Sequence, residues 1–526
     1  MNDFTNHYSR FAFPTFAATA ILVAVVLGWV GFYGSDDLSY AAGGYGWLND
    51  LPYVGVNHWT LRHTIVVPMA ALFGIFGVSE VTLVLPVTLQ YLALLALVFW
   101  LMQRYFDTTA ACIAALILGT LPLTAVAAST VVPDFAEVFF CLLSLALFYE
   151  ATRRERRTAL LLLAGVAAGF GWLTRETVVF FLLTYGVLFL AGYSIPRRQY
   201  FVMAVGFLAV VGIEFLYFTA MTGNPLYRIH TDLATHLGGD IIGSDKTASG
   251  LERALAKVEG ELYGPLSRTG SFSVSRFLDP ILVILANQEF MLLYYLAVPA
   301  ALWTAIKRPF TGSGGRMLAV FGLAGAIWFL CLYLQIGMTL LPRYYLLPTV
   351  ALIMVFAAWL RMYLWERSPA LAVALLIAMF SSHLLGIYVD NRNPIFGERA
   401  LVEYLKQTDE IVHTDPETAR RGGFLYKLAG VENRVVAAPP KAGEPFFYNP
   451  AYVAFGSMAQ NRQKLIEQLS PYKPQESWPL IWHKEPEHRH IGVVIDFLGL
   501  RDRLPAEIYR RLVTPNFPVA VYRVQP

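Results

Sequence analysis

Long apolar stretches recur along this chain as far as residue 388, with short polar connections between them. A helix needs about 20 consecutive apolar residues to cross the core of a lipid bilayer. By this criterion the pattern predicts eleven membrane-spanning helices, at residues 12–33, 81–102, 109–122, 134–151, 158–173, 177–194, 200–221, 288–306, 317–338, 344–361 and 369–388. Residues 1–389 are therefore predicted to form an all-α, polytopic membrane domain.

One apolar stretch is too short and too interrupted to be a span. The segment HTIVVPMAALFGIFGVSE, from His63 to Glu80, contains Pro68, Gly74 and Gly77. Its apolar part is about 15 residues long, which is below the length of a span. We predict an amphipathic helix that lies on the membrane surface. The alternation of sides along the other spans also requires that this segment does not cross.

The pattern changes after Tyr388, because residues 390–526 are rich in Pro, Arg, Glu and Tyr. The segments GERALVEYLKQ and ETARRGGFLYKLAG have helical periodicity, whereas EIVHTD, NRVVAAP, HIGVVIDFLG and FPVAVYRV have strand character. We predict a soluble C-terminal α/β domain over residues 390–526. The segment WHKEPEHRH fits a solvated loop before a strand, with a metal site at His483, His488 and His490 as the alternative.

Basic residues in the short connections predict the orientation. If the N-terminus is cytoplasmic, the cytoplasmic connections contain Arg104; Arg153, Arg154, Arg156 and Arg157; Arg197 and Arg198; Lys307, Arg308 and Arg316; and Arg361 and Arg367. This arrangement follows the rule that cytoplasmic loops of membrane proteins are enriched in Lys and Arg. The first outer loop (34–63), a long outer loop (222–287) with a predicted amphipathic helix at SGLERALAKVEGELYG, and the C-terminal domain then lie outside.

Composition agrees with a membrane protein. The chain is 56% hydrophobic and 15% charged, whereas a soluble domain carries about 25% charged residues. The formal net charge is +3, and nothing in the charge pattern indicates nucleic acid binding. The three cysteines, Cys112, Cys141 and Cys331, lie in apolar runs, so the sequence predicts neither a disulfide framework nor a cysteine metal site.

Charged side chains gather at the predicted outer ends of the spans. The first outer loop opens with two acids and closes with three basic residues, Asp36, Asp37, His58, Arg62 and His63. Further charged residues stand at outer helix ends, namely Asp134, Arg175, Glu176 and Arg343. Because charges at membrane depth are costly, those that are present usually line a cavity or face a partner. We predict that these residues converge on one outward-facing site. The alternative is that Arg175, Glu176 and Arg343 only anchor helix ends in the interface.

A site on the outer face has a limited choice of chemistry. The cell exterior lacks nucleotide sugars and ATP, so a transfer reaction there would use a lipid-carried donor. Arg62, Arg175 and Arg343 could bind a polyprenyl phosphate by charge-assisted hydrogen bonds. Asp36 could take a proton from an acceptor hydroxyl while that oxygen attacks an anomeric carbon. Such a one-step displacement inverts the anomeric centre.

Four segments resemble motifs of the GT-C glycosyltransferases, most closely the protein O-mannosyltransferases and the lipid A aminoarabinose transferases. Asp36-Asp37-Leu38-Ser39-Tyr40 resembles their Asp-Glu-x-x-Tyr motif, and Trp59-Thr60-Leu61-Arg62-His63 takes the place of their His/Lys-Pro-Pro-Leu element. Leu173-Thr174-Arg175-Glu176-Thr177 is similar to Leu-Thr-Lys-Glu-Thr, and Arg343-Tyr344-Tyr345-Leu346-Leu347-Pro348 to Arg-Tyr-x-Leu-Pro. The resemblance covers roughly residues 12–390. Two departures are the second acid, Asp37 rather than Glu, and the absent Pro-Pro pair.

The resemblance implies a GT-C fold and a glycosyltransferase that takes a sugar from a polyprenyl-phosphate donor. It also implies an acceptor that is a glycolipid, polysaccharide or protein of the cell envelope, and a site on the periplasmic side of a bacterial inner membrane. Asp36 then takes the place of the catalytic base, with Asp37 beside it, and Arg62 that of the donor-phosphate contact. We extend phosphate binding to His63, Arg175 and Arg343 and assign acceptor contact or support to Asp134, Glu176, Tyr40, His58 and Tyr344. Some members hold a divalent metal such as Mg or Mn through the loop acids and others do not, so the resemblance leaves metal dependence open.

Two other functional classes stay open at this point. A transporter or flippase of a lipid-linked saccharide would also need charges in the membrane, but such proteins usually show internal repeats, and the sequence shows none. A polymerase or ligase of surface polysaccharide would share the lipid donor. Those enzymes place key arginines in a large late outer loop, whereas the arginines of the 222–287 loop are scattered, at Arg228, Arg253, Arg268 and Arg276.

Overall fold

The computed structural model describes residues 2–237, 274–307, 310–334, 341–391, 393–451 and 472–525. The chain forms two compact units. Unit 1 comprises residues 1–29, 42–77 and 81–390, and unit 2 comprises residues 30–41, 78–80 and 391–526. Two short segments from the N-terminal part, one of which carries Asp36 and Asp37, thus belong with the C-terminal unit. The predicted helix SGLERALAKVEGELYG lies outside the described residues.

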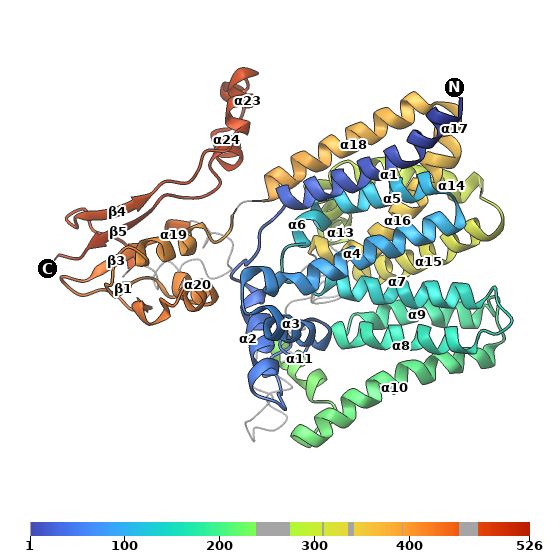
Figure 1. Ribbon diagram of the computed structural model, residues 1–526, viewed down its shortest axis with the longest axis horizontal. Helices are drawn as coiled ribbons and strands as arrows, with labels where there is room; N and C mark the ends of the chain where they lie inside the picture. The colour runs from blue at the N-terminus through green and yellow to red at the C-terminus, as the bar shows by residue number, and fades with distance from the viewer. Residues whose placement is uncertain are drawn as a thin grey trace. The chain divides into compact units, whose positions relative to one another are not determined.

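Unit 1 is a bundle in which most helices run side by side (Figure 1). Its helices are α1 (Asn2–Leu27), α2 (Asp36–Asn49, whose first residues belong to unit 2), α3 (His63–Phe76), α4 (Glu80–Tyr105), α5 (Thr108–Thr120), α6 (Pro122–Ala127), α7 (Asp134–Ala151), α8 (Thr158–Thr174), α9 (Val178–Leu190), α10 (Arg197–Thr222), α11 (Tyr227–Leu237), α13 (Val274–Ala286), α14 (Leu293–Lys307), α15 (Gly312–Leu334), η1 (Pro342–Tyr345), α16 (Leu346–Trp359), η2 (Leu360–Leu364), α17 (Trp365–Arg367) and α18 (Pro369–Asp390).

Each of the eleven predicted spans coincides with one of these helices. Among the described residues, five helical stretches are long and apolar enough to cross a membrane: Glu80–Tyr105, Arg197–Thr222, Gly312–Leu334, Pro342–Arg367 and Pro369–Asp390. They support a multi-pass membrane protein, and the count of eleven crossings stays a prediction. Several predicted boundaries were wrong: α1 ends at Leu27 rather than at residue 33, α9 ends at Leu190 rather than at residue 194, and α14 begins only at Leu293 because residues 287–292 lie outside a helix.

Small residues let two helices approach closely. A Cβ atom at Gly165 of α8 would lie 1.9 Å from the carbonyl oxygen of Met203 in α10, and one at Gly206 of α10 would lie 2.2 Å from the carbonyl oxygen of Leu162. Both distances are far below van der Waals contact, so only glycine fits at either position. Close backbone approach through small residues is a common way to pack helices in membranes.

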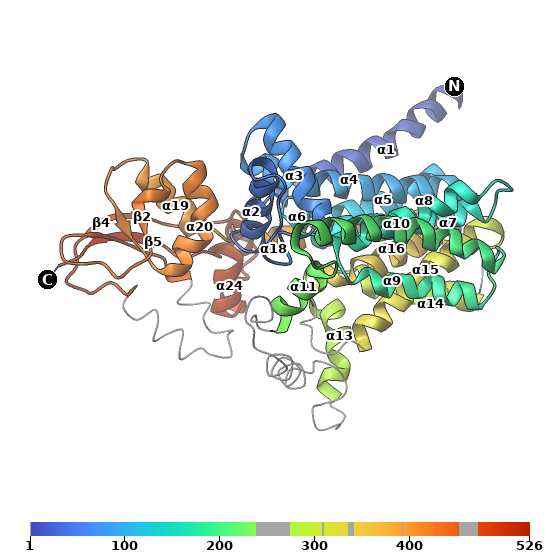
Figure 2. The ribbon, with the colours of Figure 1, turned by 90° about the horizontal axis from the view of Figure 1, so that it is seen from below.

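The predicted cytoplasmic connections and the helices α3 and α11 lie at opposite ends of the bundle (Figures 1 and 2). Connections that were predicted to be cytoplasmic meet at one end, where Arg361 Nε lies 2.8 Å from Asp107 Oδ2 and Tyr105 donates a hydrogen bond of 2.6 Å to Glu150. Helices α3 and α11 lie at the opposite end in both views (Figures 1 and 2). The segment after His63, which was predicted as a helix on the membrane surface, does form a helix, α3. Its last residues, Ile75 and Phe76, are exposed.

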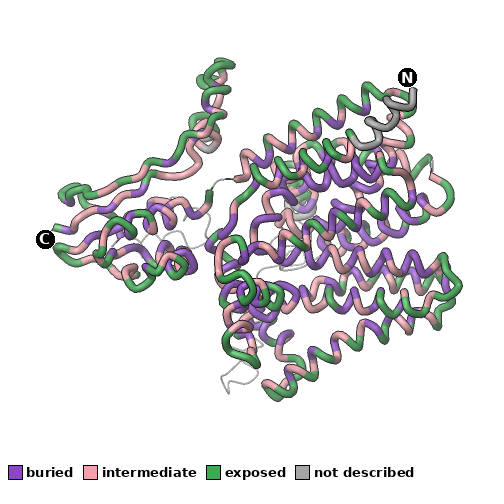
Figure 3. The backbone as a smooth tube through the Cα atoms, in the orientation of Figure 1, coloured by how far each residue is buried: buried purple, intermediate pink, exposed green. Residues whose placement is uncertain are grey.

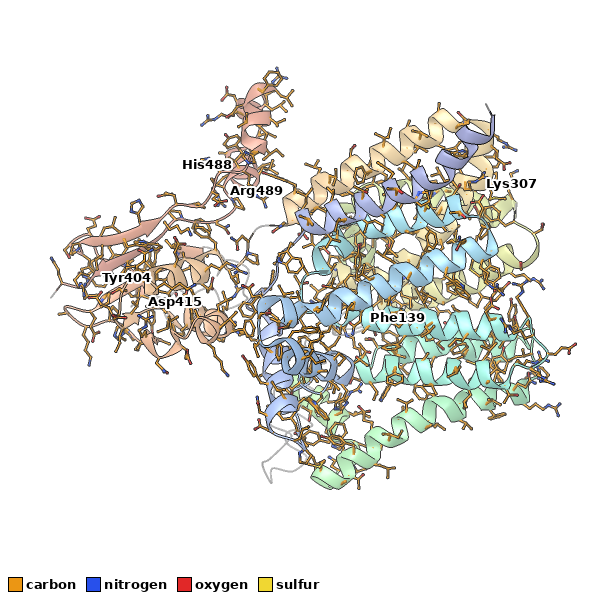
Figure 4. The ribbon with its side chains drawn as sticks, viewed as in Figure 1. Phe139, Lys307, Tyr404, Asp415, His488 and Arg489 are labelled. Carbon is orange, nitrogen blue, oxygen red and sulfur yellow. The ribbon has the colours of Figure 1, made fainter. Side chains whose placement is uncertain are left out.

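Unit 2 contains a five-stranded mixed sheet with the strand order β2-β1-β3-β5-β4. Its elements are α19 (Phe396–Leu405), β1 (Val412–His413), α20 (Pro416–Leu428), η3 (Glu432–Arg434), β2 (Val435–Val436), β3 (Pro445–Tyr448), β4 (Leu480–Lys484), α23 (Ile491–Phe497), η6 (Arg501–Arg503), α24 (Ala506–Val513) and β5 (Val519–Arg523). Strand β1 is parallel to β2 and β3, and β5 is antiparallel to β3 and β4. Asp415 caps the start of α20 by accepting a 2.9 Å hydrogen bond from the backbone N–H of Thr418 (Figure 4).

The sequence predicted five helices and strands of this unit correctly and others wrongly. Helices α19 and α20 and strands β1, β2 and β5 fall on segments of the predicted type. The segment HIGVVIDFLG was predicted as a strand but forms helix α23, which packs against α24. Strands β3 and β4 were not predicted, and β4 includes His483, which was expected in a loop.

Residues 30–41 and 78–80 are held to the C-terminal part of unit 2 by specific contacts. The Arg399 guanidinium pairs with both carboxylate oxygens of Glu80, at 2.7 and 2.5 Å, and Glu80 also accepts a 3.3 Å hydrogen bond from the backbone N–H of Phe32. The rings of Phe32 and Phe424 lie 5.0 Å apart. The segment that leads to Asp36 is thus anchored by α19 and α20.

Candidate active site

The two acids of the first loop have different environments at the start of α2. Asp37 is buried, and its carboxylate accepts hydrogen bonds from the backbone N–H groups of Tyr33 at 2.5 Å, Gly34 at 3.1 Å and Ser35 at 2.6 Å. Burial raises the pKa of Asp37 above its usual value, and these hydrogen bonds oppose that rise. Asp37 therefore fixes the shape of the loop, whereas the neighbouring Asp36 stays half-buried.

The other candidates from the first loop are also buried. Tyr40 is fully buried in unit 2, one turn along α2 from Asp36. His58, in unit 1, is buried with its ring against that of Trp59, the ring centres being 3.8 Å apart. Both residues therefore support the local fold.

Asp134, at the first residue of α7, is the centre of a buried charged cluster in unit 1. Arg175 Nη1 lies 3.1 Å from Asp134 Oδ1 and 3.7 Å from Glu137 Oε2. Arg343 Nε lies 3.9 Å from Asp134 Oδ2, and the guanidinium groups of Arg175 and Arg343 lie 4.5 and 5.8 Å from the centre of the Tyr344 ring. The structure thus brings together predicted site residues from α7, the α8–α9 connection and η1.

A second cluster is built around Arg228 of α11, which is almost fully buried. Its guanidinium lies 2.7 Å from Glu176 and 2.7 Å from Glu214 of α10, and it also donates a hydrogen bond to the carbonyl oxygen of Trp172. Burial alone would lower the pKa of Arg228, but the two carboxylates raise it above its usual value. In the same way burial alone would raise the pKa of Glu176, but Arg228 and then Arg62 lower it. Glu176 and Arg228 are therefore a charged pair.

Two residues at the start of α3 connect these clusters. Arg62 is buried and acts electrostatically on both Glu137 and Glu176. His63 Nδ1 lies 3.7 Å from Glu214 Oε1, and its ring packs edge-on against Trp47 with ring centres 5.8 Å apart. The start of α3, the first turn of α7 and the end of α8 thus meet at one end of the bundle.

Glu289 lies in the turn between α13 and α14 and was not identified from the sequence. Burial, and then the charge of Asp390, raise the pKa of Glu289 to about 8, with Arg343 opposing the rise and Asp134 adding to it. Its side chain is nevertheless half-accessible. Its backbone oxygen accepts a 3.1 Å hydrogen bond from the N–H of Leu123, which fixes the turn against α6.

Two more carboxylates of these clusters, Glu137 and Glu214, were also not identified from the sequence. Each lies inside an apolar run that was interpreted only as a span. An ionisable residue inside such a run is costly and therefore a site candidate in its own right. This signal was present in the sequence for both residues.

The predicted site residues are divided between the two units. Asp36, Asp37 and Tyr40 belong to unit 2, whereas the remaining candidates belong to unit 1. A divalent metal does not fit the described loop acids well, because both oxygens of Asp37 already accept backbone hydrogen bonds. In the described parts of the chain, no three side chains of His, Cys, Asp or Glu are grouped to hold a metal ion.

Comparison with known proteins agrees with this architecture. Residues 63–220 match the family of dolichyl-phosphate-mannose-protein mannosyltransferases. The structure is similar to ArnT from Cupriavidus metallidurans in the apo state, with a TM-score of 0.53 and 14% identity over 86% of this chain and 96% of that one. It is also similar to the same protein bound to undecaprenyl phosphate, with a TM-score of 0.52 and 14% identity over 86% and 95% of the two chains. A comparison with curated protein sequences gives no significant match. The match over residues 63–220 agrees with the resemblance to the protein O-mannosyltransferases that the motifs indicated, and the similarity to ArnT shows that the two proteins share a fold.

Proposed function

We propose that this chain, a glycosyltransferase of the GT-C fold, transfers a sugar from a polyprenyl-phosphate donor to a hydroxyl group of a cell-envelope acceptor. The observation that carries this proposal is the gathering of Arg62, Arg175 and Arg343 at one end of a bundle of apolar helices. A polyprenyl phosphate needs a site of this kind, because cations bind its phosphate and apolar surface binds its hydrocarbon chain. The ArnT structure that holds undecaprenyl phosphate has the same fold.

The contacts separate the roles of the arginines. Arg175 lies between Asp134 and Glu137, so its charge is largely compensated and we assign it to positioning Asp134. Arg343 is about one-third exposed and approaches Asp134 only to 3.9 Å. We assign the donor phosphate to Arg343 and Arg62, because guanidinium groups match phosphate oxygens in pairs. His63, packed between Glu214 and aromatic rings, orients the start of α3.

Asp36 is the proposed catalytic base. An acceptor oxygen attacks the anomeric carbon while its proton passes to the Asp36 carboxylate. The new bond joins that oxygen to the anomeric carbon. The bond between this carbon and the phosphate oxygen breaks, and polyprenyl phosphate leaves with the electron pair. A single displacement of this kind inverts the anomeric centre.

Asp37 and Asp134 support this reaction without proton transfer. Asp37 holds the loop through three backbone N–H groups, and this contact fixes the backbone beside Asp36. Asp134 holds Arg175 and approaches Arg343, and so it sets the position of the phosphate-binding group. No step is assigned to a metal ion. The outer, periplasmic side of a bacterial inner membrane is the proposed location, since nucleotide-sugar donors are absent there.

The test is a donor panel with the purified chain in nanodiscs. Polyprenyl-phosphate sugars that differ in the sugar are supplied with a membrane extract as the acceptor source, and release of polyprenyl phosphate is measured. Release from one donor with labelled sugar in the acceptor fraction is the expected result. Movement of intact donor across the bilayer of proteoliposomes that contain the chain, without release, would instead support a flippase.

A further inference from the structure

Helices α23 and α24, joined through η6, project from unit 2 beyond β4 and β5 (Figures 1 and 4). His488 and Arg489 lie where the chain from β4 enters this pair of helices (Figure 4). The proposed glycosyl transfer uses none of these residues. We call residues 488–513 the helical tip.

The helical tip has one packed face. Gly492 and Ile495 of α23 are buried, and a Cβ atom at Gly492 would lie 3.0 Å from the Val513 side chain of α24. The backbone N–H of Arg489 donates a 2.9 Å hydrogen bond to the carbonyl oxygen of Val513. This face therefore holds the two helices together.

The opposite face of α23 is apolar and exposed. Val493, Val494, Phe497 and Leu498 are exposed by 71%, 52%, 87% and 58%. Their spacing of three and four residues places them on one side of a helix. Ile508 of α24 adds a further apolar side chain that is 47% exposed, and Figure 3 shows how much of the tip is exposed. An apolar patch of this kind marks an interaction surface.

The charge of the helical tip selects its partner. Residues 488–513 contain five arginines and three acidic residues. Arg501 and Arg503, both exposed, follow directly after the apolar face. Exposed Phe, Val and Leu beside arginines are typical of segments that lie in the interface of a membrane with anionic lipids.

The chain itself keeps the helical tip near a membrane. Unit 2 begins at Val30, shortly after α1, and its other two segments adjoin α4 and α18, both of which are apolar enough to span a membrane. Unit 2 is thus joined along the chain to three apolar helices, two of which can span a membrane, and a tethered contact is favoured by the high effective concentration of its partner.

We propose that the helical tip docks on the membrane that holds unit 1, with Phe497 and Val493 inserted at the level of the acyl chains and Arg501 and Arg503 against anionic phosphate headgroups. The docking is independent of the catalytic proposal, because it uses no residue of the candidate active site. It assigns a membrane-facing side to unit 2.

The test uses photocrosslinking of the full chain in nanodiscs. Phe497 is replaced by p-benzoylphenylalanine, which keeps the aromatic ring, and the matched control carries the same replacement at Ile411, an exposed apolar residue of unit 2. Nanodiscs contain either phosphatidylglycerol with phosphatidylcholine or phosphatidylcholine alone. After irradiation, mass spectrometry identifies the adduct. We expect a lipid adduct at position 497 that is several-fold more abundant than at 411 and that falls in neutral nanodiscs.

Other outcomes would overturn the proposal. A crosslinked dimer at position 497, or a protein adduct in native membranes in place of the lipid adduct, would identify a second copy or a protein as the occupant. Equal lipid adducts at 497 and 411 would show unspecific contact. The same replacement at Val493 provides a second position if the Phe497 variant does not fold. Arg501→Glu combined with Arg503→Glu should lower the adduct in anionic nanodiscs, whereas Arg420→Glu, at an exposed residue of α20, should not.

Discussion

Arg175 and Arg228 are buried beside carboxylates, whereas Arg343 remains partly accessible. A buried ion is tolerated only when opposite charges and hydrogen bonds replace its water. Because carboxylates neutralise the charges of Arg175 and Arg228, we assign these two arginines a structural role: their ion pairs hold α7, α8, α10 and α11 together at one end of the bundle. We propose that Arg62 and Arg343 bind the donor phosphate, so each of these arginines has a different expected mutant phenotype.

Replacement of Arg62 by Ala should weaken donor binding. Loss of one charge-assisted hydrogen bond costs about 1.5–3 kcal/mol, which corresponds to a Kd about one to two powers of ten higher. The measurement is a titration of the purified variant with a polyprenyl-phosphate sugar. Arg198→Ala, an exposed arginine at the start of α10, is the control and should bind like the wild type. An unchanged Kd for Arg62→Ala would reject this assignment.

Glu289 should make the stability of the protein depend on pH. Its pKa is 4.5 in an unfolded chain and about 8 in the folded protein, so between these values the folded state binds more protons. Stability must then fall as the pH rises from about 5 to 8. Glu289→Gln removes this titration and should show a flatter dependence of apparent Tm on pH, with a higher Tm than the wild type above pH 8. Parallel Tm curves for the two proteins would contradict this role of Glu289.

At the scale of whole elements, the length of apolar runs predicted the helices of unit 1 well, because lipid thickness sets that length. α7, for example, has the predicted bounds Asp134–Ala151. The pattern could not show how the helices pack. It also failed at Val493, Val494 and Ile495, since β-branched residues favour strands locally while contact with α24 selects a helix. Glu289 was missed because one acid beside a long apolar run carries little signal by itself.

The close contact of α8 with α10 predicts a difference between two glycines of the same helix. At Gly206 an added methyl group would lie 2.2 Å from a backbone oxygen, whereas nothing lies within 4 Å of one at Gly212. Gly206→Ala should therefore destabilise the protein by about 1–3 kcal/mol, seen as a lower apparent Tm in detergent. Gly212→Ala should leave Tm unchanged or raise it slightly. Equal Tm values for both variants would argue against this packing.

The Arg399–Glu80 pair predicts that unit 2 affects turnover through the Asp36 loop. Partly exposed ion pairs contribute about 0.2–1 kcal/mol, so Arg399→Ala should lower kcat by about two- to fivefold with donor Kd unchanged. The double variant Glu80→Arg with Arg399→Glu should restore part of the rate. Arg420→Ala, which breaks an exposed pair within α20, serves as the control. A rise in donor Kd with kcat unchanged would exclude loop positioning.

At the scale of the whole molecule, the division between the units does not coincide with a simple boundary in the sequence. The tail was predicted as a separate domain, yet the structure groups it with residues 30–41, which carry both loop acids. Local patterns could not show this, because it depends on contacts such as Phe32 with Phe424, almost 400 positions apart in the chain. The charged residues at the ends of the apolar runs did identify Arg175, Arg343 and Asp134, which meet in unit 1.

The most direct test of the proposed glycosyl transfer compares single turnovers of Asp36→Asn and Asp50→Asn in nanodiscs. The matched control Asp50 is an exposed carboxylate just beyond the end of the same helix, α2. With saturating donor and acceptor, we expect the transfer rate of Asp36→Asn to fall by about two to four powers of ten, the usual contribution of a general base. Donor Kd should stay near the wild-type value, and Asp50→Asn should turn over normally. Transfer by Asp36→Asn at the wild-type rate would contradict the assignment of Asp36 as the base.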